Sequence, residues 1–81
     1  MDMRRLVGAN FARLRRDRGL TQEEVAERSG FSQQYISGLE RGLRNPTVVT
    51  LFELAQALGA FPQQLLQTAE LEKQSVKREK R

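Results

Sequence analysis

The sequence predicts a small all-α domain built from five short helices. Three observations support this fold class: apolar residues recur at helical spacing, glycines stand where the apolar stretches end, and no stretch alternates with a period of two. The chain has 81 residues, enough for one domain, and aromatic residues make up only 6% of it. A β-sandwich or barrel of this size typically contains more aromatic and β-branched residues.

The first two helices are expected before residue 31. The apolar stripe of the first helix consists of Leu6, Val7, Phe11 and Leu14. Gly19 is expected to end this helix, because glycine readily adopts the left-handed conformation of a C-cap. The second helix begins with a capping box, in which the Thr21 hydroxyl accepts from the Glu24 amide while the Glu24 carboxylate accepts from the Thr21 amide. Gly30 is expected to end it.

The third and fourth helices are expected to start at hydroxyl side chains. Ser32 can cap the third helix, which has Ile36 and Leu39 on its inward face, and Gly42 is expected to end it. The fourth helix follows Thr47, since the preceding proline cannot continue the third one. The apolar stripe expected for the fourth helix consists of Val48, Leu51, Phe52, Leu54, Ala55 and Leu58.

The domain is expected to close with a short fifth helix. Gly59 should end the fourth helix, and Pro62 should begin the fifth. We therefore assign residues 1–68 to one domain and residues 69–81 to a basic C-terminal tail. Few large apolar residues occur in that tail, so a frayed helix and a disordered segment both remain open for it.

Composition excludes several classes of function. The chain contains no cysteine and no histidine, which removes disulfides, thiolate metal sites, the usual zinc ligand and the usual general base. We therefore expect no enzyme, no catalytic residue, no metal or cofactor and no small-molecule ligand. Since no apolar run approaches the roughly 18 residues of a membrane span, and no secretory signal is evident, we expect a cytoplasmic protein.

Charge indicates the class of partner. Lysine and arginine number 14 against 10 acidic residues, which gives a formal net charge of +4. A small basic domain is typical of proteins with a polyanionic partner, although charge alone does not identify it.

The junction of the second and third helices predicts a helix-turn-helix. Only a few residues around Gly30 join them, and so short a connection forces a steep crossing. Gly30 can adopt the positive φ that the turn needs, and Ala26 is small where the third helix must come close. Val25, Ile36 and Leu39 are expected to form the core that the two helices share.

Three runs of sequence resemble the phage-repressor-like (Cro/CI, or XRE) helix-turn-helix family. They are LTQEEVA at 20–26 followed by Gly30, SQQYISGLERG at 32–42, and NPT at 45–47. The resemblance covers roughly residues 4–67. It implies a five-helix, lambda-repressor-like domain, of prokaryotic or phage origin, that binds double-stranded DNA as a two-fold dimer and controls transcription.

The resemblance also implies which residues read the bases. It places the third helix in the major groove, and the base-reading residues would be Gln33, Gln34, Ser37 and Ser32. A glutamine amide can pair bidentately with adenine, at about 1–3 kcal/mol of discrimination. The alternatives are ordinary solvated glutamines and a Ser32 that only caps the helix. Gly38 cannot read a base, so reading is expected to be confined to the first turn.

Phosphate contacts are implied for four residues, namely Gln22, Tyr35, Arg44 and Asn45. Gln22 begins the second helix, and helix N-termini favour anions. The alternative to a phosphate contact is a solvated loop arginine for Arg44 and partial packing in the core for Tyr35.

The resemblance further implies an ion pair between Arg15 and Glu40. It would lie beneath the binding surface and would hold the third helix in place without touching DNA. Two independent surface charges are the alternative.

The leading expectation is therefore a sequence-specific transcriptional regulator, a repressor that binds an inverted repeat as a homodimer. A restriction–modification controller protein and an antitoxin that binds its own promoter are alternatives, as is a helical protein-interaction module without a DNA role. The candidate dimer surface contains Phe61, Leu65 and Leu66, although the core is the favoured assignment for Leu65.

Overall fold

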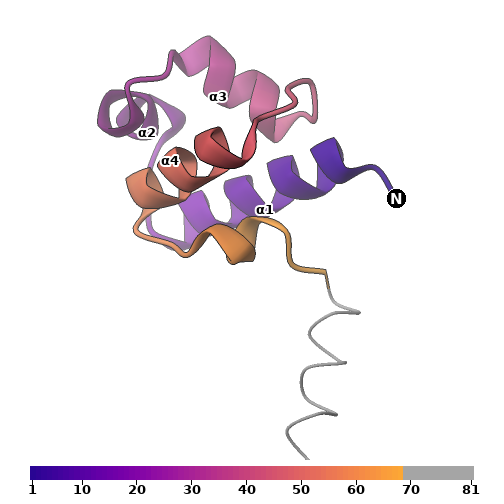
Figure 1. The fold of residues 1–81 in the computed structure, drawn as a ribbon. Coiled ribbons are helices and arrows are strands. Elements are labelled where there is room, and N and C mark those ends of the chain that lie inside the picture. Colours follow the sequence, from indigo (N-terminus) through magenta and orange to yellow (C-terminus); the bar gives the residue numbers. More distant parts are fainter. Residues whose placement is uncertain (69–81) are drawn as a thin grey trace, which may run out of the picture.

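The computed structural model describes residues 1–68, which form four α-helices and one 3-10 helix (Figure 1). The elements are α1 (Met3–Asp17), α2 (Gln22–Ser29), α3 (Gln33–Glu40), α4 (Val48–Leu58) and the 3-10 helix η1 (Pro62–Leu65). The all-α class is thus confirmed, and no strand occurs in this part of the chain. The expected short fifth helix is present only as the four-residue 3-10 helix that begins at Pro62, so a count of five α-helices is not confirmed. The expectation for residues 69–81 lies outside the described residues.

Side-chain caps set the helix boundaries that the sequence predicts. Both halves of the capping box are present, since Glu24 N donates to Thr21 Oγ1 at 3.0 Å and Thr21 N donates to Glu24 Oε1 at 2.9 Å. Ser32 Oγ accepts from the first turn of α3, and Thr47 Oγ1 accepts from the first turn of α4. Gly30 ends α2 in the left-handed conformation, with φ of 81°. Local capping chemistry therefore accounts for where these helices begin and end.

One apolar core joins all five elements. Its buried residues are Val7, Phe11, Leu14, Val25, Ile36, Leu39, Leu54, Ala55, Leu58 and Leu65. Two residues of the expected α4 stripe do not belong to it, because Val48 is 82% exposed and Phe52 is 51% exposed. Residues two apart on an α-helix point roughly 160° apart, so Phe52 faces away from the side on which Leu54 is buried. Val48 lies in the first turn of α4, before the part of the helix that the core covers.

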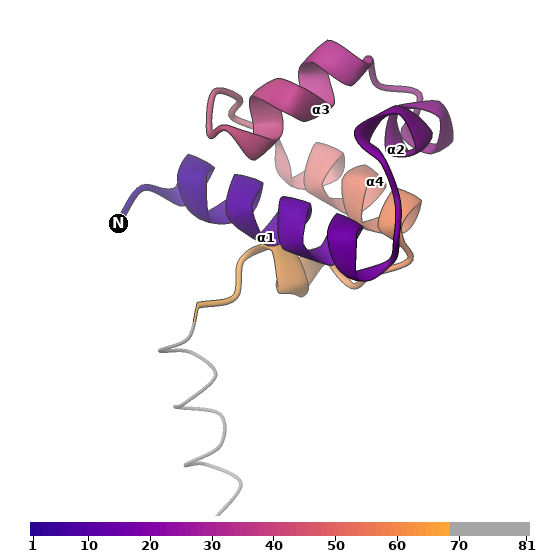
Figure 2. The ribbon, with the colours of Figure 1, turned by 180° about the vertical axis from the view of Figure 1, so that it is seen from behind.

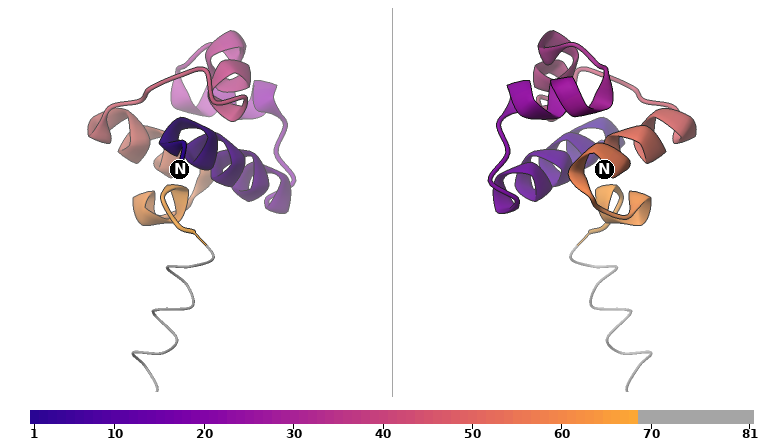
Figure 3. Two further views of the ribbon diagram at one scale, coloured as in Figure 1. Left: turned by 90° about the vertical axis from the view of Figure 1, so that its right-hand side faces the viewer. Right: turned by 90° about the vertical axis from the view of Figure 1, so that its left-hand side faces the viewer.

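Helix α1 lies at the centre of the molecule. It packs against α3 on one side and η1 on the other, while α4 packs against α2 and η1. The views in Figures 1, 2 and 3 agree that α2 and α3 lie together on one side of α1 and that η1 lies on the opposite side. The pair of α2 and α3 is thereby left with one face toward solvent.

A buried amide attaches the C-terminal end of the described chain to α1. Asn10 is only 8% exposed, and its Nδ2 donates to the carbonyl oxygens of Leu65 at 2.8 Å and Gln67 at 3.0 Å. These bonds satisfy carbonyl groups at the end of η1, and they hold the fully buried Leu65 against α1. Leu66, the next residue, is 39% exposed and does not enter the core. No helix of residues 1–68 has the length and apolar character that crossing a membrane requires.

Candidate nucleic-acid interface

Helices α2 and α3 share a buried apolar contact beneath their exposed face. Val25 and Ile36 are fully buried, Leu39 is 1% exposed, and Ala26 is partly buried against the same core. The backbone turns between the helices at Gly30, whose positive φ suits a residue without a side chain. The two helices are therefore locked as one unit that presents the first turn of α3 to solvent.

The exposed face of this unit holds an open hollow with polar walls. It is lined by Gln22, Gln33, Gln34, Ser37, Arg41 and Arg44. The glutamines at positions 33 and 34 are exposed, and the hydroxyl at position 37 is half-buried. Five residues singled out in the sequence thus come together in space. Arg41 was missed, although it stands four residues after Ser37 and so shares its helix face.

Three of the predicted DNA-contact residues do not line this hollow: Tyr35, whose surroundings are described below, Ser32 and Asn45. Ser32 accepts a hydrogen bond of 3.0 Å from Tyr35 N, so its hydroxyl serves as the N-cap of α3. Asn45 is exposed but lines a different crevice, which lies between the start of α1 and residues of α4 and of the chain that follows η1. The hollow beside α3 therefore contains none of the three.

Arg15 and Glu40 form a bidentate ion pair under the hollow. Arg15 Nε donates to Glu40 Oε2 at 2.7 Å, and Nη2 donates to Oε1 at 3.1 Å. Their side chains are 12% and 7% exposed. The hydrogen bonds that Arg15 donates to Glu40 are the main cause that raises the pKa of Arg15, burial opposes this rise, and the charge of the carboxylate adds to it. Arg15 also donates to the Leu20 carbonyl at 2.8 Å. The pair connects the end of α1 to the end of α3.

Gly8 brings α1 directly onto the backbone of α3. A Cβ at this position would collide with the carbonyl oxygen of Leu39 and would lie 2.9 Å from that of Glu40. The two helices approach so closely only because the side chain is absent. Sequence reasoning missed this residue, since nothing within the first helix distinguishes a packing glycine from any other small residue.

Tyr35 belongs to a stack of side chains at the edge of α3. Its ring lies 4.9 Å from the ring of Phe31 at an interplanar angle of 20°, and the guanidinium carbon of Arg44 lies 5.4 Å from its centroid on the ring face. Burial raises the pKa of Tyr35, and the positive charge of Arg44 opposes that rise. Tyr35 is thus partly packed against the core and also lies beside Arg44.

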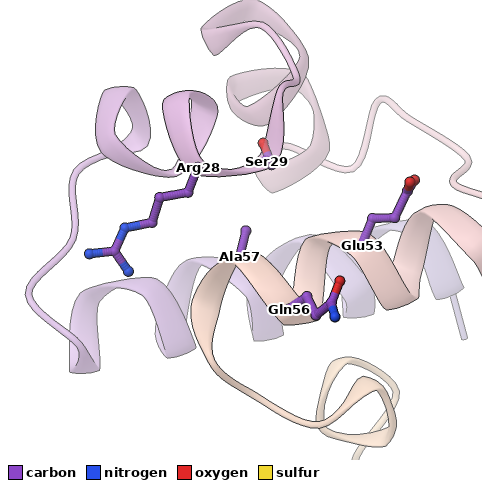
Figure 4. Close-up of a pocket in the computed structure, with 5 residues that line it drawn as sticks. All are labelled: Arg28, Ser29, Glu53, Gln56 and Ala57. Carbon is purple, nitrogen blue, oxygen red and sulfur yellow. The ribbon is translucent and has the colours of Figure 1, made fainter.

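A second hollow lies between α2 and α4 (Figure 4). It is lined by Arg28, Ser29, Glu53, Gln56 and Ala57. The long side chains of Arg28 and Glu53 point away from each other and do not converge on one point. Small-molecule sites typically combine enclosure with convergent polar groups, so this open hollow does not have their form. Within residues 1–68, no group of three acidic side chains is placed to hold a metal ion.

Comparison with known proteins identifies the family. The helix-turn-helix family HTH_3 matches residues 11–62, which contain α2, α3 and α4 in full and the C-terminal part of α1. The chain belongs to the HTH_3 family. The predicted resemblance to phage-repressor-like helix-turn-helix proteins is thereby confirmed.

Relatives of this HTH_3 protein include regulators and controller proteins. The uncharacterized HTH-type transcriptional regulator y4dJ of Sinorhizobium fredii is 81% identical over 59 residues, which are 73% of this chain and 77% of that protein. Control protein C.SmaI of Serratia marcescens is 39% identical over 66 residues, 82% of this chain and 79% of that protein. The restriction-modification controller protein C.AhdI from Aeromonas hydrophila has a crystal structure similar to this fold. Its TM-score is 0.73 at 39% identity, covering 76% of this chain and 94% of that one.

These similarities confirm that the HTH_3 protein is a DNA-binding transcriptional regulator. They point to a family of regulators and not to a family of enzymes.

Proposed function

We propose that this regulator reads duplex DNA with α3 in the major groove and represses transcription as a homodimer on an inverted repeat. The observation that carries the proposal is the hollow beside α3, where two exposed glutamines, a serine and two arginines meet. Amides and a hydroxyl supply base-reading groups, and the arginines supply positive charge toward the DNA.

Gln33 and Gln34 are the proposed base readers, with Ser37 beside them. Within residues 1–68, neither glutamine side chain has a hydrogen-bond partner, so both amides are available for adenine edges. Ser32 is assigned to base reading only in addition to its capping bond, because one lone pair of its hydroxyl is already used.

Gln22, Tyr35, Arg44 and Asn45 are the proposed phosphate contacts. Gln22 begins α2, where unpaired backbone N–H groups favour an anion. Asn45 extends the contact surface toward α1, because it lies outside the hollow. Arg15 and Glu40 are proposed to hold α3 at its angle, since their largely buried side chains pair next to Gln22, which lines the hollow.

Exposed apolar side chains support the proposed dimer. Phe61 is 69% exposed, Phe52 51% and Leu66 39%, and all three lie on α4 or beside η1. Leu65 is fully buried, so we leave it out of the proposed dimer surface. A two-fold dimer would place its half-sites about 10 bp apart.

A second proposal follows from the likeness to C.AhdI. Because that neighbour is named a restriction-modification controller protein, we propose that this chain controls such a gene pair in its host. Restriction and modification genes next to its own gene, with the selected operator before them, would support this role. A neighbouring toxin gene would favour the antitoxin alternative.

A DNA-selection experiment on the purified 81-residue protein tests the primary proposal. Wild type, Gln33→Ala and Gln34→Ala are each used to enrich random duplexes, and affinities are then measured over a salt series. Gln56→Ala is the matched control, because Gln56 is an exposed helical glutamine on α4. We expect an inverted repeat whose preference relaxes only in the α3 variants, by about 1–3 kcal/mol per lost adenine pair.

Salt dependence separates phosphate contacts from base reading. Affinity should fall with salt in all variants, because each neutralised phosphate releases counterions. Uniformly weak, salt-sensitive binding without any enriched sequence would contradict the proposal, and a protein partner would then be sought.

A further inference from the structure

Arg44 occupies the space that a side chain at position 38 would fill. Gly38 lies in the second turn of α3, four residues after Gln34 and hence on the same helix face. A Cβ on Gly38 would lie 2.9 Å from Arg44 Nε, 3.5 Å from Cζ and 3.6 Å from Cγ. The backbone of Gly38 is buried, because the side chain of Arg44 covers it. A residue from the loop after α3 thus stands where the helix has left a gap.

The ring of Tyr35 supports the same arginine from a second direction. The guanidinium carbon lies 5.4 Å from the ring centroid, and Phe31 stacks on that ring at 4.9 Å. A guanidinium over an aromatic face is attracted by the ring, so its freedom is reduced before any ligand arrives. With the bare backbone at position 38 and the ring at position 35, the exposed Arg44 is held on the recognition helix.

The place where Arg44 is held is the hollow beside the base-reading glutamines. Arg44 lines this hollow together with Gln34 and Ser37. Phosphate attraction needs only a positive charge nearby, whereas base reading needs a side chain of defined orientation. A planar guanidinium matches the two acceptors, O6 and N7, on the major-groove edge of guanine.

We propose that Arg44 reads a guanine in the operator from the position that Gly38 leaves open, with Gly38 and Tyr35 as positioning residues. This inference rests on the proposed DNA-reading function and gives Arg44 a specific role in place of a general phosphate contact. The preferred half-site should then contain a G·C pair next to the base pairs read from position 34.

The first test compares DNA selected by wild type, Arg44→Ala and Arg44→Lys. We expect Arg44→Ala to lose the preference for guanine at one position of each half-site by roughly 5- to 150-fold, the equivalent of 1–3 kcal/mol. The preferences set by Gln33 and Gln34 should stay. Arg44→Lys keeps the charge but not the planar fork, so it should retain affinity for random duplexes and lose most of the preference.

The second test asks whether Gly38 acts through Arg44. Gly38→Ala removes no functional group, yet it should displace Arg44 and weaken the same guanine preference. In the Arg44→Ala background, the same substitution should leave DNA binding unchanged. Thermal unfolding without DNA is an independent readout, since alanine is favoured over glycine within a helix. Gly38→Ala should raise Tm in the Arg44→Ala background by more than it does in wild type.

Several results would overturn this inference. An Arg44→Ala variant that loses affinity equally for all sequences would make Arg44 a phosphate contact only. Equal effects of Gly38→Ala in both backgrounds would show that the glycine does not act through Arg44. In either case, wild type would still enrich a sequence through its glutamines, so the proposed function would stand. Failure of wild type to enrich any sequence would instead overturn both.

Discussion

Gln22 donates a hydrogen bond of 3.0 Å from its Nε2 to Oε1 of Glu40, and the same oxygen accepts a bond of 3.1 Å from Arg15. Side chains from α1 and α2 therefore meet at a carboxylate that belongs to α3. The Gln22 amide nitrogen has two hydrogens, so with one bonded to Glu40 the other can still donate to a phosphate oxygen. The carboxylate thus orients a proposed phosphate contact as well as anchoring the recognition helix.

Removing only Arg15 from the ion pair with Glu40 should lower the free energy of unfolding more than removing both charges. Arg15→Met is expected to lower the free energy of unfolding by roughly 3–5 kcal/mol, because Glu40 would keep a buried charge without its main partner. The double variant Arg15→Met/Glu40→Leu should recover most of that loss. Urea unfolding monitored by circular dichroism measures both values. If the two charges were independent, the loss in the double variant would instead equal the sum of the losses in Arg15→Met and Glu40→Leu.

Gly8→Ala should destabilise the domain, although the same change within an ordinary helix is stabilising. Alanine is favoured over glycine by up to about 1 kcal/mol in a helix interior. At position 8 the new methyl group would collide with α3 carbonyls, and overpacking of this kind typically costs about 1–3 kcal/mol. A lower Tm would show that the collision outweighs the gain in helix propensity, and a higher Tm would show the reverse. Ala9→Gly, at the exposed neighbouring position, is the control and should cost only the helix propensity.

The ionisation of Tyr35 should report the position of Arg44 without any DNA. Tyr35 is the single tyrosine of the chain, which contains no tryptophan, so its phenolate absorbance can be followed directly. Burial raises the Tyr35 pKa, and we expect a midpoint above the ordinary value of about 10. Since the charge of Arg44 lowers this pKa, Arg44→Ala should move the midpoint higher still.

The same raised pKa carries a consequence for stability. The folded state holds the Tyr35 proton more tightly than the unfolded chain, so stability is unchanged by this group below about pH 10 and falls as the pH rises beyond it. Tyr35→Phe should remove this part of the alkaline decline. An unchanged midpoint in Arg44→Ala would mean that the arginine does not rest on the ring in solution.

Asn10→Ala should release η1 from α1. The substitution removes two hydrogen bonds to carbonyl oxygens near the end of the described chain, and one of these bonds is buried. A loss of about 1–3 kcal/mol is expected, since a buried acceptor would be left unsatisfied. Asn45→Ala, at an exposed loop position, is the matched control and should change stability little. Hydrogen exchange would locate the loss, with the Leu66 amide losing protection first.

Local chemistry made the helix boundaries predictable. The capping box at Thr21, the caps at Ser32 and Thr47, and the left-handed Gly30 each depend on residues within one turn of chain. The bidentate geometry of Arg15 and Glu40 was implied only by the family resemblance, because the two residues stand 25 positions apart.

Features that depend on contacts between two elements were not predictable from the residues within one turn of chain. Spacing placed Val48 and Phe52 among the apolar residues of α4, but contacts with α2 and η1 decide which side of that helix is covered. Gly8 and Gly38 carry no signal of their own, since each is needed only because of what lies opposite. The fifth element was placed correctly at Pro62, yet its four residues form a 3-10 turn, a length at which an α-helix gains few of its own hydrogen bonds.

The close contact of Gly8 with the end of α3 has a practical consequence for engineering. The C-terminal half of α3 is fixed by backbone contact and by Glu40, whereas Gln33 and Gln34 protrude freely and hold nothing in place. The C-terminal half of α3 therefore holds the helix in place, whereas its first turn can be varied. Libraries that vary only Gln33 and Gln34 should yield folded variants with new target sites. Substitutions in the C-terminal half of α3 should instead prevent folding before any target is tested.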